Sequence, residues 1–144
     1  MRFQQFGERY IIRLEQHETV IEELVKFLSK ENVEFANVSA AGAVQWIELE
    51  YWNAKSKSYE SRTFDEQLEV VSFQGNASLK DGKPMLHIHG VFGREDFSVV
   101  AGHVKEARAY PTLEVWLRTE SIPVRRVKDE GTGLFLMDLP EQLR

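Results

Sequence analysis

The sequence contains no cysteine in its 144 residues. This absence excludes disulfide bonds, thiolate zinc sites and a cysteine nucleophile, and it is compatible with a cytoplasmic location. A long apolar run is also missing. The N-terminal stretch MRFQQFGERYIIRLEQHE carries charges throughout, so we expect neither a signal peptide nor a membrane span. We therefore expect a cytoplasmic protein that does not enter a membrane.

Positive charge is in the minority, with 18 Lys and Arg against 23 Asp and Glu and a net charge of -5. A nucleic-acid-binding protein usually needs a basic face, because neutralisation of phosphates supplies most of its non-specific affinity. The chain also lacks internal repeats and linkers rich in Pro, Gly or Ser. Its length and its 42% of apolar residues suit one hydrophobic core, so residues 1–144 are expected to form a single compact domain.

The periodicity of apolar residues predicts one helix and several strands. Thr19 to Lys30 has apolar residues at the spacing of one helix face, and Thr19 and Glu22 form a candidate capping box. Alternating or β-rich stretches predict strands, and glycines near the end predict a hairpin. The expected strands are 10–15, 34–52, 68–79 and 112–120, with the hairpin around 131–133. This pattern indicates an α+β fold with a mostly antiparallel sheet.

Three of the four histidines lie in the segment LHIHGVFGREDFSVVAGHV, residues 86–104. His87 and His89 share one strand face, because side chains two residues apart point the same way. If strands near 85–93 and 97–105 form a hairpin with its tip at 94–96, His103 lies directly across from His87. A hairpin loop with an even number of residues would instead send His103 to the opposite face.

Three imidazoles on one face point to a metal ion. Neutral imidazole binds zinc, copper, nickel and ferrous iron, and three protein ligands with an open fourth position are typical of catalytic zinc. The alternative is that the histidines merely occupy a polar sheet face or a subunit interface. The spacing alone leaves both interpretations open.

The same segment carries a resemblance to a known family. The chain resembles the plants-and-prokaryotes-conserved (PPC) domain in its stand-alone prokaryotic form. The matching stretches include ETVIEELVKFLSKENV, ANVSAAGAVQWIELEYWN and YPTLEVWL, and the most specific piece is the His-x-His strand with its later histidine. The family's Gly-Gly-His reads Ala101-Gly102-His103 here, a small-for-small exchange.

The resemblance implies a fold around an antiparallel sheet and assembly as a homotrimer. Isolated prokaryotic PPC domains are often labelled DNA-binding, because in plants the domain accompanies AT-hook peptides in nuclear proteins. The fold is also similar to that of acetolactate decarboxylase, a zinc enzyme whose ligands include a His-x-His strand and a later histidine. His87, His89 and His103 match that layout, which favours zinc as the metal. The similarity in fold does not transfer the reaction.

Five other residues are candidates for a role. Arg125 and Arg126 form the only compact basic cluster and are the candidate DNA contacts, although they also suit a solvated strand face. Glu114 is the candidate catalytic carboxylate, or an exposed strand residue. Arg94 and Asn76 are candidates for substrate binding, or else a solubilising hairpin tip and a bulge residue.

Three functions follow as expectations. The resemblance implies a DNA-binding or regulatory protein, trimeric, with a three-histidine metal site. The alternative is a zinc-dependent enzyme that acts on a small carbonyl or ester substrate, which needs an acid or base near the metal. In a third interpretation, the metal only stiffens a subunit contact or senses an ion.

Overall fold

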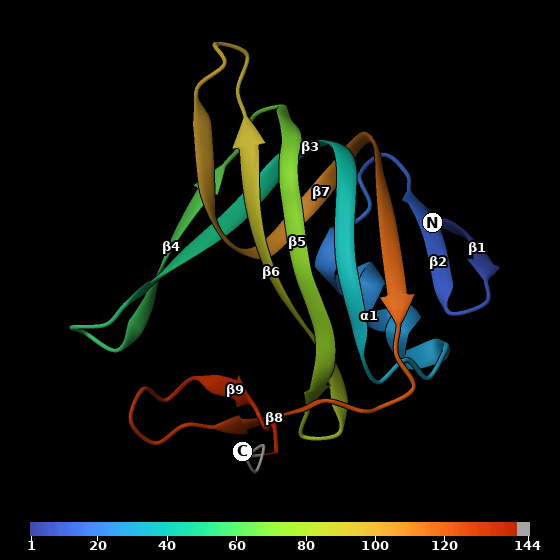
Figure 1. The fold of residues 1–144 in the computed structure, drawn as a ribbon. Helices are drawn as coiled ribbons and strands as arrows, with labels where there is room; N and C mark the ends of the chain where they lie inside the picture. The colour runs from blue at the N-terminus through green and yellow to red at the C-terminus, as the bar shows by residue number, and fades with distance from the viewer. Residues whose placement is uncertain (141–144) are drawn as a thin grey trace.

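A computed structural model of the chain describes residues 1–140. It has one helix and nine strands in this part of the chain (Figure 1). They are β1 (Arg2–Phe6), β2 (Arg9–Leu14), α1 (Val20–Lys30), β3 (Ala36–Asn53), β4 (Ser58–Phe64), β5 (Leu68–Lys80), β6 (Lys83–Gly93), β7 (Val99–Thr119), β8 (Arg125–Lys128) and β9 (Phe135–Met137).

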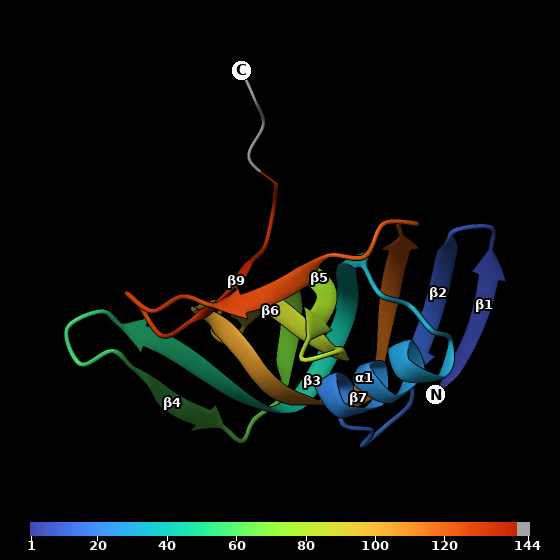
Figure 2. The ribbon, with the colours of Figure 1, turned by 90° about the horizontal axis from the view of Figure 1, so that it is seen from below.

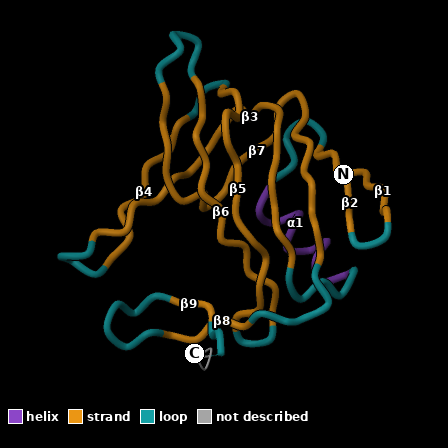
Figure 3. Tube along the Cα trace, viewed as in Figure 1, coloured by secondary structure: helices purple, strands orange, loops and turns teal. Residues whose placement is uncertain are grey.

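The predicted fold class is confirmed, because one helix accompanies a large sheet (Figure 3), and the strands of this sheet pair almost entirely antiparallel. Three details differ from the prediction. Strands β1 and β4 were not expected, since every residue of β1 and all but the last residue of β4 are exposed. The strand predicted over 112–120 is the second half of β7, which continues through Pro111.

Four strands pair around a closed ring. Strand β3 pairs with β5, β5 with β6, β6 with β7, and β7 again with β3. Such closure requires long, bent strands, and β3 and β7 both have register shifts along their shared ladder. The ring brings residues from four separate stretches of sequence to one surface.

The helix and the C-terminal hairpin lie on opposite sides of the sheet (Figure 2). The apolar stripe of α1 is buried against the sheet through Val20, Leu24, Phe27 and Leu28. The β8–β9 hairpin joins the sheet at β5, through a short parallel pairing with β8. The core therefore lies under the helix, and the opposite side of the sheet carries the polar side chains considered next.

The predicted capping box of the helix is wrong. Thr19 makes no side-chain hydrogen bond to the helix backbone and instead bonds the carboxylate of Glu22. The carboxylate of Glu106, on β7, accepts the N–H groups of Ile21 and Glu22 at 2.8 and 3.1 Å. A carboxylate also interacts favourably with the positive end of the helix dipole, so the cap comes from 85 positions away in sequence.

None of the helices among residues 1–140 is long and apolar enough to cross a membrane.

Candidate metal centre

The three histidines lie on one face of the β6–β7 hairpin, as the odd loop predicted, but the predicted register is wrong. His103 pairs with His89 and not with His87, and Ala101 pairs with Val91. His87 lies two residues from His89 on the same face. The ring nitrogens therefore still converge from both strands.

The turn explains the shifted register. The backbone N–H of Arg94 donates to the carbonyl of Ser98 at 2.8 Å, and Phe97 N–H donates to the Arg94 carbonyl at 2.9 Å. Phe97 has a φ of 64°. A tight turn followed by one left-handed residue is a common three-residue hairpin loop, usually with Gly at the left-handed position. Because phenylalanine and not glycine occupies this position, the sequence did not indicate where the loop begins. The loop covers residues 95–97 and not 94–96.

The geometry of the cluster fits a metal ion. The Nε2 atoms of His87 and His89 are 3.1 Å apart, and one ligand nitrogen from each of the three histidines lies within 4.8 Å of the others. A tetrahedral zinc ion with bonds of about 2.0–2.1 Å holds its nitrogen ligands about 3.3 Å apart. Small side-chain rotations would bring the three nitrogens to that spacing.

The electrostatics of the cluster favour neutral imidazoles. Burial lowers the pKa of His87 to about 4, and the Arg126 guanidinium and the other two rings act in the same direction. Burial also lowers the pKa of His103, against the opposing effect of Glu50. Both rings are therefore uncharged at neutral pH, which is the form that binds a metal.

A cavity of about 580 Å³ adjoins the histidines, between the β6–β7 ladder and the β8–β9 hairpin. His87 and His103 line it together with Glu50, Tyr59 and Arg126. The volume lies within the range of about 300–1,000 Å³ that is typical of small-molecule sites. An ion held by the histidines would therefore face a space large enough for a small ligand.

Arg126 belongs to this cavity. One expectation was that Arg126 lies on a solvated strand face. This expectation is wrong, because the residue is only 7% exposed. Its guanidinium donates to Ser78 Oγ at 2.8 Å, to the Phe135 carbonyl at 2.8 Å and to Asn76 Oδ1 at 3.1 Å. Asn76, a candidate for ligand binding, thus holds Arg126, and it pairs directly with His87 across β5 and β6.

Three other predicted residues are not brought to the histidines. Glu114 is exposed and lies on β7 eleven residues from His103, about 36 Å along the strand at 3.3 Å per residue. Arg94 is at the base of the hairpin loop, where its Nε–H donates to Glu66 at 3.1 Å. Arg125 is exposed at the start of β8 and does not line the cavity.

Two residues that the sequence did not single out lie beside the cluster. Glu50 pairs directly with His103 across β3 and β7, and its side chain is 14% exposed. The ring centroid of Tyr59 is 5.8 Å from that of His103. Burial raises the pKa of the Tyr59 phenol, and Glu50 acts in the same direction. The β3–β7 register, which sequence patterns do not reveal, brings Glu50 to this position.

Comparison with known families agrees with the fold and the histidine strand. The sequence profile of the Plants and Prokaryotes Conserved (PCC) domain, also abbreviated PPC, matches residues 1–121. The chain belongs to this family. None of the curated proteins matches it. The family assignment covers every strand of the ring, and the β8–β9 hairpin that carries Arg126 lies beyond the matched residues.

Several solved structures are similar to this one. A candidate DNA-binding protein from Bacteroides thetaiotaomicron is 28% identical with a TM-score of 0.92, over 95% of this chain and 96% of that one. A metal-containing protein from Archaeoglobus fulgidus is 31% identical with a TM-score of 0.85, over 96% and 99%. The α-acetolactate decarboxylase of Bacillus subtilis is 15% identical with a TM-score of 0.56, over 90% and 60%, and shares the fold alone.

Proposed function

We propose that this PCC-domain protein binds a transition-metal ion, zinc in the first instance, through His87, His89 and His103. The observation that carries the proposal is the convergence of three imidazoles, two of which, His87 and His103, line a cavity. The name of the Archaeoglobus fulgidus protein, which is described as metal-containing, supports it. A site open to a cavity favours ligand binding at the metal over a purely structural ion.

The metal-dependent enzyme is the function that this geometry supports best. A bound zinc ion supplies Lewis acidity toward a carbonyl oxygen. Glu50 lies beside His103 and takes the acid–base role that was expected of Glu114. The ring of Tyr59 lies next to the ring of His103. A small carbonyl or ester substrate suits both the size of the cavity and these groups.

Hydrolysis of 4-nitrophenyl acetate by the zinc-loaded protein tests this activity. We expect the wild-type rate to exceed that of His89→Ala, and Glu50→Gln to retain zinc while losing most of the rate. His17→Ala is the matched control, because His17 is exposed and bonds Gln16 and Gln45 away from the cavity. Equal rates for wild type and both site variants would contradict the enzyme proposal.

DNA binding stays a prediction that the name of the Bacteroides thetaiotaomicron protein supports. Arg126 directs three of its N–H groups to acceptors within the chain, so Arg125 is the basic residue of this cluster left for a phosphate contact. Fluorescence anisotropy with labelled duplex DNA at 50 and 200 mM salt tests it. Binding that weakens with salt and in Arg125→Ala would support DNA binding.

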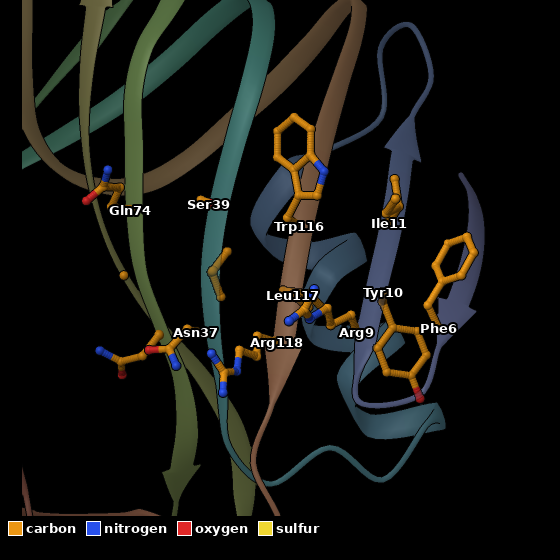
Figure 4. A pocket seen from close by; sticks show the side chains of 13 residues that line it. Phe6, Arg9, Tyr10, Ile11, Asn37, Ser39, Gln74, Trp116, Leu117 and Arg118 are labelled. Atoms are coloured by element: carbon orange, nitrogen blue, oxygen red, sulfur yellow. The ribbon is translucent and has the colours of Figure 1, made fainter.

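A cytoplasmic location stays a prediction. We also propose that the protein assembles as a homotrimer, as the family resemblance implies. The surface of β1, β2 and β7 exposes three large apolar side chains, Phe6, Ile11 and Trp116, at 52%, 42% and 40%, beside Arg9 and Arg118 (Figure 4). They line a hollow of about 950 Å³ that holds no histidine or carboxylate, so it suits a subunit contact better than catalysis. Light scattering of wild type and Trp116→Asp tests this: a trimer that dissociates in the variant supports the assignment.

A further inference from the structure

The charge of Arg126 is not balanced within the described part of the chain. The residue is 7% exposed, yet no carboxylate of residues 1–140 lies within 4.0 Å of its guanidinium. Its three hydrogen bonds go to a hydroxyl, a carbonyl and an amide oxygen, all neutral. A guanidinium has five N–H donors, so two remain for a further acceptor.

A buried cation without a counter-charge is costly, and proteins normally pair it or give it a ligand. Burial lowers the pKa of Arg126, which shows the direction of this cost. The rest of the cavity wall adds positive charge. Lys57, Lys80 and Lys128 line it with Arg126, whereas Glu50 is its single carboxylate among the described residues. The cavity therefore favours an anion even before a metal ion is bound.

Arg126 is also held next to the histidines. Its Nη2 atom bonds Asn76 Oδ1 at 3.1 Å, and Asn76 pairs directly with His87. Side chains of directly paired residues have their Cβ atoms about 5 Å apart. An anion on the guanidinium would thus lie within the length of a small molecule from an ion on the histidines.

We propose that the cavity binds a small organic carboxylate, with its carboxylate group on Arg126 and a second oxygen directed to the metal position. Only the placement of the second oxygen rests on the proposed metal site, and the contact between the carboxylate group and Arg126 does not depend on it. Two free N–H groups suit the two oxygens of a carboxylate. Trp52, Met85 and Phe135 line the same cavity and give an apolar wall for a carbon skeleton. Inorganic phosphate has no carbon skeleton to use that wall.

Calorimetric titration of the zinc-loaded, full-length protein with pyruvate, acetate and inorganic phosphate tests the inference. We expect pyruvate to bind most tightly, and Arg126→Gln to weaken pyruvate binding by at least about tenfold, as loss of a charged hydrogen bond predicts. Arg125→Gln removes the same charge from the neighbouring exposed position and should bind pyruvate as the wild type does. Arg126→Lys, which keeps the charge without the planar fork, should bind with intermediate affinity if Arg126→Gln does not fold.

The outcomes separate this inference from the proposed metal site. If all variants bind zinc and Arg126→Gln also binds pyruvate like wild type, the carboxylate site is refuted while the metal site stands. If phosphate binds more tightly than pyruvate, the assignment to an organic carboxylate is refuted. If the wild type binds no zinc, the proposed metal site is refuted, and the carboxylate site is then tested on the metal-free protein. Acetate binding that is present in wild type and lost in Arg126→Gln supports the carboxylate site. Failure of the wild type to bind acetate overturns it.

Discussion

Replacement of Gly75 by alanine should damage both the sheet and the metal site. Gly75 lies on β5 directly opposite Ile88 of β6. A Cβ atom at this position would overlap the carbonyl oxygen of His87 and lie 2.8 Å from the His87 carbonyl carbon and 2.9 Å from the Ile88 Cα. These are backbone atoms, so no side-chain rotation relieves the clash.

The size of the effect follows from the contact distances. Ordinary carbon–carbon contacts are about 3.5–4.0 Å, so β6 has to move by about 1 Å. Overpacking of this kind costs about 1–3 kcal/mol of folding free energy. The moving strand carries His87, and metal–ligand distances tolerate about 0.2 Å, so we also expect zinc affinity to fall by at least about tenfold.

Urea denaturation of the metal-free protein measures the first effect, and competition with a chromophoric zinc chelator measures the second. Gly131→Ala is the matched control, because its Cβ would only reach Asp129 Oδ2 at 3.4 Å. We expect the control to stay within about 0.5 kcal/mol of wild type. A Gly75→Ala variant with the stability and zinc affinity of the control would refute the close approach of β5 and β6.

Two further changes test the fold. Glu106→Ala removes the acceptor for the N–H groups of Ile21 and Glu22 and should cost about 0.5–2 kcal/mol in urea denaturation, whereas Glu95→Ala at the hairpin tip should cost nothing measurable. Equal stability of these two variants would contradict the cap. Ile88→Ala empties a fully buried site between the two histidines of β6 and should cost about 2–5 kcal/mol, and a loss below about 1 kcal/mol would show that this part of the core is not packed as described.

Sequence patterns predicted the elements that bury a face. The helix ends where its apolar stripe ends, and β3 and β5 follow their alternation, because burial of one face imposes that periodicity. Strand β1 has no buried residue and β4 has none, so neither has a pattern to detect. The helix cap was mispredicted because a distant carboxylate, Glu106, competes with the local Thr19 and Glu22.

The candidate site was predictable only along the hairpin. The hairpin alone places the three histidines on one face. Any loop with an odd number of residues has this result, so the prediction did not depend on the residue at which the loop begins. The partners from other strands depend on long-range register: Glu50 reaches His103 after three register shifts between β3 and β7, and Arg126 turns inward because Ser78 and Asn76 on β5 accept its hydrogen bonds. No short-range pattern in the sequence encodes these contacts.

Metal analysis of the untagged protein, purified without chelator or added metal, tests the central claim most directly. Elemental analysis should find about one zinc or other transition ion per chain in wild type and in His17→Ala, and none in the variant that combines His87→Ala with His89→Ala. No metal in any of these samples, together with failure of the wild type to bind added micromolar zinc, would contradict the three-histidine centre.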